Sequence, residues 1–239
     1  MGRKRNHQKK SPAVDATDSP LLSCQVSPVY GRYLCTKVDV QKGDLLIKEK
    51  YLVAGPLSLS GVVCIGCHSD LSKKFFRFKC TKCSWPLCAN KCQKSPFHAI
   101  ECQFLLEHKI LPPEEPDSVS YGAITVLRAC LLKKTKPREY SKLMGLEAHN
   151  DIRKGLPLWD ANEEHVVKVI RDEWKLGQDF TADEIHTICG ILEVNGFEIG
   201  DVYSFLGLFA VTSMLAHDCV PNATHFENID EGVMERQRR

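Results

Sequence analysis

The chain has 239 residues, of which 43% are hydrophobic and 26% are charged, a composition that is ordinary for one or two globular domains with a buried core. The formal net charge of +2 gives no general case for binding to nucleic acid or to a membrane surface. No run of about 18 apolar residues is present, so we expect no transmembrane helix. The basic first ten residues lead into no apolar stretch, so we expect no secretory signal.

Residues 1–22 are polar and basic and show no apolar period, so we expect a disordered basic tail. Five Lys or Arg residues among the first ten are typical of a nuclear localisation signal. The alternative is a solvated tail that has no targeting role.

Residues 25–55 alternate in the manner of strands, and the turn residues Lys42, Gly43 and Asp44 predict a hairpin between two of these strands. After a cysteine-rich segment the apolar period becomes helical. We expect helices over residues 101–109, 119–133 and 162–174, the first of them stopped by two prolines.

A further helix begins at a capping box, in which the Thr181 hydroxyl and the Glu184 carboxylate satisfy backbone donors. Gly196 is the expected stop of this helix. Residues 227–239 are charged and nearly without apolar side chains, so we expect a divergent tail outside the core.

The twelve cysteines indicate a reducing compartment, because clustered cysteines without a secretory signal are more often metal ligands than disulfides. Seven of them lie between residues 64 and 102. The other five are interpreted mainly as small buried side chains: Cys24, Cys35, Cys130, Cys189 and Cys219.

The cysteine-rich segment has metal-ligand spacing, because two C-x2-C pairs are followed by further Cys and His residues. Two such pairs and four more ligands close two tetrahedra, and a closed tetrahedral Zn²⁺ site is structural. The segment has few large apolar side chains, so we expect its fold to need the roughly 10–16 kcal/mol that a structural zinc supplies. His68 is interpreted as a bystander. The eight predicted ligands are Cys64, Cys67, Cys80, Cys83, Cys88, Cys92, His98 and Cys102.

The ligand string resembles the MYND finger, and the residues around it resemble a split SET domain. Residues 29–34 and 40–49 are similar to the first SET half, and residues 195–197 and 216–222 to the second. The chain therefore resembles the SET and MYND domain family of protein-lysine methyltransferases, above all its arthropod branch.

This resemblance implies an α+β fold, in which a β-rich SET domain is split by a helical insert and by a two-zinc MYND finger. It also implies that Cys64, Cys67, Cys88 and Cys92 hold one zinc, and that Cys80, Cys83, His98 and Cys102 hold the other. The implied organisation is a tail (1–22), a first SET part (23–60), the finger (64–102), a helical insert (103–185), an incomplete second SET part (186–226) and a divergent tail (227–239).

In the family, S-adenosylmethionine lies against a G-x-G strand pair and an N-H-S-C motif. The resemblance assigns this cofactor to Gly31, Tyr33, Asn195, Ala216 and His217. Tyr33 replaces the second glycine, which obstructs close backbone approach, and Ala216 replaces an asparagine that offers an amide. The serine of the motif is also replaced, by an aspartate at position 218, which adds negative charge.

The family continues beyond the last matched residues with a tyrosine-bearing strand and a post-SET cysteine cluster. No tyrosine of this chain matches that position, so the catalytic residues stay unknown. We therefore expect weak or no methyltransferase activity from the chain as given.

Two functions compete at this point. The first is methylation of lysines in a protein substrate. The second is a non-catalytic module, in which the finger docks proline-containing peptides of transcriptional regulators in the nucleus or the cytoplasm. The departures at Tyr33 and Ala216 favour the second. Direct DNA binding is not expected, because much of the finger's basic charge offsets its thiolates.

The basic run supplies a first prediction. If it is a nuclear signal, deleting residues 2–11 shifts a fluorescently tagged chain toward the cytoplasm, as imaging of the nuclear-to-cytoplasmic ratio will measure. An unchanged ratio identifies the run as a solvated tail.

Overall fold

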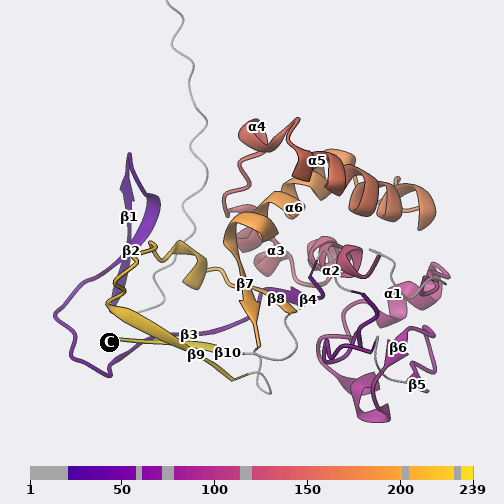
Figure 1. The fold of residues 1–239 in the computed structure, drawn as a ribbon, viewed down its shortest axis with the longest axis horizontal. Coiled ribbons are helices and arrows are strands. Elements are labelled where there is room, and N and C mark those ends of the chain that lie inside the picture. The colour runs from indigo at the N-terminus through magenta and orange to yellow at the C-terminus, as the bar shows by residue number, and fades with distance from the viewer. Residues whose placement is uncertain are drawn as a thin grey trace, which may run out of the picture.

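The structure is a computed structural model, and it describes residues 21–57, 61–71, 78–113, 120–200, 205–228 and 233–238. The described elements form an α+β fold, as predicted (Figure 1). The predicted basic tail lies outside the described residues except at its end, where the first strand begins at Leu22. Within the described residues, no helix is long and apolar enough to cross a membrane.

In the described part of the chain, the strands form four small antiparallel sheets. Strands β1 (Leu22–Ser27) and β2 (Gly31–Thr36) make a hairpin, and the finger contains a second pair, β5 (Phe78–Lys79) and β6 (Pro86–Leu87). One three-stranded sheet has the order β3 (Leu45–Lys50), β10 (Val233–Arg238) and β9 (Ala223–Asn228). The other has the order β4 (Val53–Gly55), β8 (Phe205–Leu208) and β7 (Gly196–Ile199).

Both three-stranded sheets join segments from the two ends of the chain, as a split domain requires. Strand β3 pairs with β10, and β4 pairs with β8. Figure 1 shows the early strands, drawn in indigo, beside the late strands, drawn in orange and yellow. A small apolar core links the two sheets, and it consists of Ala54, Ile199, Phe205, Phe209 and Met234.

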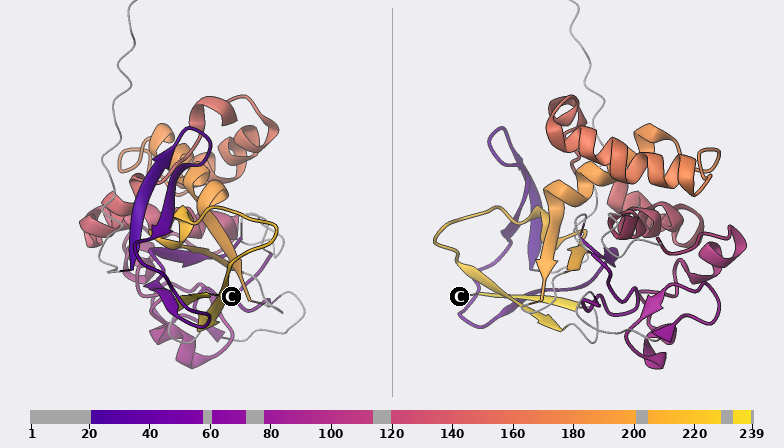
Figure 2. Two further views of the ribbon diagram at one scale, coloured as in Figure 1. Left: turned by 90° about the vertical axis from the view of Figure 1, so that its left-hand side faces the viewer. Right: turned by 45° about the vertical axis from the view of Figure 1, so that its right-hand side comes forward.

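The helices are α1 (Cys102–Glu107), α2 (Ser120–Thr135), α3 (Pro137–Met144), α4 (Asn150–Arg153), α5 (Pro157–Asn162) and α6 (Ala182–Asn195). Residues of α2 from Tyr121 to Leu132 are buried on every face, and all of them except Thr125 and Arg128 lack a strongly polar side chain. Helix α2 packs against α3, α6 and β4. The finger and the β1–β2 hairpin lie at opposite ends of the molecule (Figures 1 and 2).

The helical predictions are largely confirmed. Helix α6 begins after Thr181, whose hydroxyl accepts from the Glu184 N–H at 3.2 Å, and it ends before Gly196. Only half of the predicted capping box forms, because the Glu184 carboxylate instead accepts from Lys133 at 2.9 Å and from the Tyr140 hydroxyl at 2.5 Å. Most of the stretch predicted over 162–174 is π-helical, in Glu163–Val167 and Val169–Glu173.

Two strand predictions are wrong. The hairpin near the N-terminus is β1–β2 and not a pair around Gly43, because β3 finds its partner in β10. Residues 233–238, expected in a coreless tail, form the central strand of a sheet. The charged residues of this segment gave no sign of a buried strand, but the Met234 side chain is fully buried and supplies the apolar contact.

The position of Met234 generates a second prediction. Met234→Ala destabilises the protein by about 2–5 kcal/mol, because it opens a cavity between the two sheets. Glu235→Ala on the opposite face removes a partly exposed ion pair with Lys48 and costs at most about 1 kcal/mol. Urea unfolding of both variants measures the difference, and equal small losses will show that β10 is peripheral.

Candidate metal centres

The finger is built on two similar turns, one at each C-x2-C pair. In the first, the His68 N–H donates to the Cys64 carbonyl at 2.7 Å, and in the second the Ser84 N–H donates to the Cys80 carbonyl at 2.9 Å. Both donor residues have a left-handed backbone conformation, with φ of 61° at His68 and 66° at Ser84. A left-handed backbone costs a non-glycine residue roughly 1–2 kcal/mol. The finger therefore contains two copies of the same strained turn, and each copy presents the two thiols of one C-x2-C pair.

Gly66 lets the first turn approach the rest of the finger. A Cβ at this position would lie 2.6 Å from the Cys92 carbonyl oxygen and 2.7 Å from the Cys92 Cβ. Any larger residue therefore pushes the turn away from Cys92. The close contact brings ligands from distant parts of the finger to one point.

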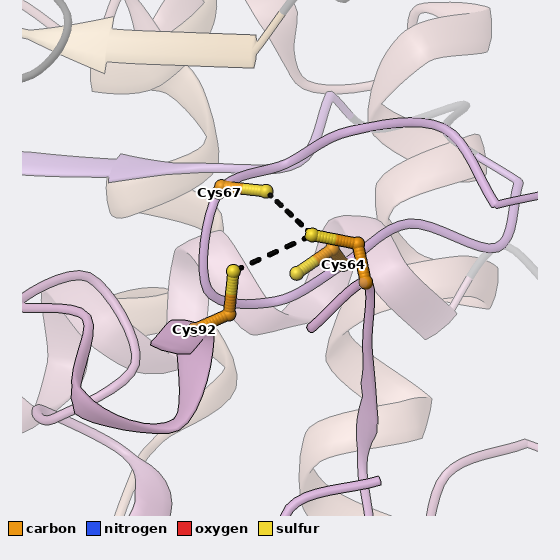
Figure 3. Close-up of side chains that lie close together, drawn as sticks. Cys64, Cys67 and Cys92 are labelled. Atoms are coloured by element: carbon orange, nitrogen blue, oxygen red, sulfur yellow. Dashed lines mark hydrogen bonds between the residues drawn. The ribbon is translucent and has the colours of Figure 1, made fainter. Parts of the chain in front are cut away.

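The first cluster contains Cys64, Cys67, Cys88 and Cys92, whose sulfur atoms all lie within 4.8 Å of one another. The Cys67 and Cys88 sulfurs are 3.5 Å apart, and the Cys88 and Cys92 sulfurs are 3.4 Å apart. Figure 3 shows the labelled Cys64, Cys67 and Cys92 side chains converging on one point.

The second cluster contains Cys80, Cys83, His98 and Cys102, with the same limit of 4.8 Å between ligand atoms. The Cys80 and Cys102 sulfurs are 3.6 Å apart, and the Cys83 sulfur lies 3.6 Å from His98 Nε2. All four of these residues are buried. The two groups are the ligand sets that the resemblance implied.

The geometry fits tetrahedral zinc. Zn–S distances of about 2.3 Å place the sulfurs of a tetrahedron about 3.8 Å apart, close to the spacings of 3.4–3.6 Å in the two clusters. None of the twelve cysteines, all of which the structure describes, forms a disulfide. Four protein ligands leave no open position, which is typical of structural Zn²⁺ rather than of a catalytic metal.

The electrostatics of the thiols also favour a cation. A hydrogen bond from Cys64 lowers the pKa of Cys67 to about 4, and the same contact raises the pKa of Cys64. Burial raises the pKa of Cys92 to about 12 and that of Cys102 to about 11. Cys64, Cys92 and Cys102, whose pKa values are raised, therefore keep protons that a divalent cation replaces when it binds.

The predicted cofactor residues lie in two neighbouring places. Gly31 begins β2 with φ of 62°, and no described atom lies within 4 Å of where its Cβ would be. Strand β2 lies beside the short helix Thr212–Met214, which precedes Ala216 and His217. The Ser213 hydroxyl donates to the Asn195 carbonyl at 2.9 Å and so brings the end of α6 to the same region.

The side chains in this region have local partners. The Asn195 amide nitrogen donates to the Glu147 carbonyl at 2.7 Å and to the Ile191 carbonyl at 2.9 Å, which uses both of its N–H groups. The Tyr33 ring lies 5.8 Å from the Tyr30 ring. His217 Nε2 lies 3.6 Å from the Cys219 sulfur at an exposed position. Assignment of these residues to a cofactor stays a prediction.

Sequence reasoning missed two residues beside the second cluster, Glu101 and Arg128. Both side chains are fully buried, and Arg128 Nη2 donates to Glu101 Oε1 at 2.7 Å. The available signals were a charged residue in the middle of an otherwise apolar helix and a carboxylate three residues after a ligand histidine. His68 stands outside both ligand groups, as predicted.

The clusters generate a third prediction. Cys80→Ser lowers the zinc content of the purified chain from two ions toward one and unfolds the finger, because a hydroxyl is a poor zinc ligand. Cys219→Ser is the matched control, since Cys219 is exposed and outside both clusters. Elemental analysis and amide NMR spectra measure the two effects. A metal-free chain with an intact finger will refute the assignment.

Comparison with known proteins gives the relatives of the chain, although no family model matches it. The chain is 27% identical over 223 residues to the Drosophila melanogaster SET domain-containing protein SmydA-8, isoform A, an alignment that covers 88% of this chain and 46% of the relative. It is 24% identical to isoform B over 213 residues, which covers 84% and 45%. The chain spans about half the length of the curated relatives it matches. It is therefore a distant homologue of SmydA-8, which confirms the resemblance to the SET and MYND domain family.

Proposed function

We propose that this chain is a zinc-stabilised SET and MYND protein that acts mainly by binding other proteins, in transcriptional regulation in the nucleus or the cytoplasm. The closed form of both metal centres carries the proposal. Each cluster has four protein ligands, so the metals stabilise the finger and leave recognition to its surface. The proline-containing peptide as ligand comes from the resemblance to MYND fingers.

The cofactor region supports binding over catalysis. Both N–H groups of the Asn195 amide are engaged within the protein, so this residue offers a ligand only its carbonyl oxygen. Position 216 is alanine and offers no amide, and position 33 carries a tyrosine where close backbone approach needs glycine. The region therefore presents few donors to S-adenosylmethionine.

Methylation of protein lysines is the second candidate, and one observation favours it. The end of α6, the segment before Ala216 and the strand of Gly31 lie side by side, although they are far apart in sequence. The open space over Gly31 leaves its backbone accessible. Weak binding of S-adenosylmethionine is compatible with both candidates, so turnover distinguishes them.

The fourth prediction tests the choice by calorimetry on the zinc-loaded chain. A proline-containing peptide binds with micromolar affinity, about −8 kcal/mol, because a small module makes a transient contact. The same peptide with alanine in place of proline is the control. Duplex DNA binds only weakly at physiological salt, and sequence-specific DNA binding will contradict the proposal.

A methyltransferase assay on the same sample completes the test. Little or no methyl transfer to histone or other lysines is expected. The double variant Tyr33→Gly/Ala216→Asn binds S-adenosylmethionine more tightly, since it restores backbone access and an amide, but it gains no turnover. Robust methylation by the unaltered chain that His217→Ala abolishes will favour the enzyme instead.

A further inference from the structure

Glu101 and Arg128 form a charged pair in the interior of the protein. Neither side chain is exposed, and the guanidinium holds the carboxylate at both oxygens. Arg128 Nε donates to Glu101 Oε2 at 3.0 Å, and Arg128 Nη2 donates to Glu101 Oε1 at 2.7 Å. Such a bidentate contact fixes the carboxylate in one orientation.

The remaining donors of Arg128 reach two other parts of the protein. Nη1 donates to the Ala54 carbonyl in β4 at 2.7 Å and to His68 Nε2 at 2.9 Å. Nη2 donates to the Ile65 carbonyl in the finger at 2.7 Å. All five N–H groups of the guanidinium therefore have partners, and these partners come from the finger and from the sheet of β4.

On its other side, Glu101 faces a metal ligand. Glu101 Oε1 lies 3.1 Å from His98 Nδ1, and His98 Nε2 is the ring nitrogen that faces the thiols. A nitrogen that binds a metal carries no proton, so Nδ1 of the neutral ring carries it and donates to Glu101. A carboxylate in this place sets the tautomer and the orientation of a ligand histidine.

We propose that Glu101 positions His98 for the second metal, and that Arg128 holds Glu101 and so joins this metal centre to the sheet of β4. The chain of contacts runs from the metal ligand through one carboxylate and one guanidinium to the Ala54 carbonyl. The inference rests on the zinc binding proposed above, and metal content of the unaltered chain tests that part separately.

The first experiment measures metal affinity in the full chain loaded with Co²⁺, in competition with a chelator. The first centre has four thiolates, and the second has three thiolates and an imidazole, so the two centres differ in their d–d absorption bands. Glu101→Gln weakens the second centre about 10–100-fold and leaves the first centre unchanged. Long-range NMR of the zinc-loaded His98 ring reports the Nδ1-protonated tautomer in the unaltered chain.

Glu107→Gln is the matched control. It makes the same substitution at the last residue of α1, the helix that follows Glu101, at an exposed carboxylate that accepts from Gln103 at 2.9 Å. This variant keeps the affinity of both centres. Equal weakening by both substitutions, or no weakening by either, will overturn the role of Glu101.

A double variant separates positioning from general destabilisation. Glu101→Gln leaves the charge of Arg128 buried without its partner, whereas Glu101→Gln/Arg128→Met removes both charges. The double variant regains thermal stability relative to the single one, but its second centre stays weak. If the metal affinity returns together with the stability, or if both centres weaken equally in the single variant, the carboxylate has only a structural role.

Hydrogen exchange tests the link to the sheet. Chelator removal of the second metal from the unaltered chain lowers amide protection at β4, because Arg128 then loses its fixed partner. In the Arg128→Met variant, which lacks the link, metal removal changes protection at β4 less. Protection at β4 that responds equally in both proteins will refute the link.

Discussion

The buried pair between Glu101 and Arg128 is the contact on which the arrangement of finger and sheet depends. Removing two charges from water costs several kcal/mol per ion, and only good geometry with further hydrogen bonds offsets that cost. Arg128 meets this condition, since its donors end on Glu101, His68 and the carbonyls of Ala54 and Ile65. Loss of one partner alone leaves an uncompensated charge, which costs about 3–5 kcal/mol. The finger is therefore anchored to the rest of the fold by buried contacts and is not an independent appendage.

The same helix also holds β4 directly. The Thr125 hydroxyl donates to the Pro56 carbonyl at 2.7 Å. Thr125 also lies so close to Gly55 that a side chain at position 55 would collide with it. Strand β4 has only three residues and lies at the edge of its sheet, where it pairs with β8, and α2 supplies further contacts. In the preceding strand, β3, the Glu49 carboxylate accepts from the backbone N–H groups of Val211 and Thr212 at 2.9 Å each. The early strands are thus joined to the late segment of the chain by polar contacts as well as by strand pairing.

The features that could be predicted from the sequence are those that a local pattern of residues encodes. Ligand spacing predicted the eight metal ligands, and the family resemblance implied how they divide into two clusters. Helical periodicity with its caps predicted α1, α2 and α6. Sequence reasoning failed where partners are distant in sequence, because no local signal says that β3 pairs with β10 rather than with a neighbour. The buried charges escaped for the same reason. Arg128 looks like a solvated residue until its partner Glu101, 27 positions earlier, is placed beside it.

The contacts of Asn195 limit what a small change can restore near the predicted cofactor region. Its amide is held by the Glu147 carbonyl, which follows α3, and by Ile191 in its own helix. A ligand that needs this amide must break two hydrogen bonds, one at an exposed and one at a half-buried position, at about 0.5–1.5 kcal/mol for each bond. Substituting Tyr33 or Ala216 does not alter these bonds. Cofactor affinity gained at those two positions is therefore independent of Asn195, and its amide becomes available only if the contact between α6 and the Glu147 carbonyl opens.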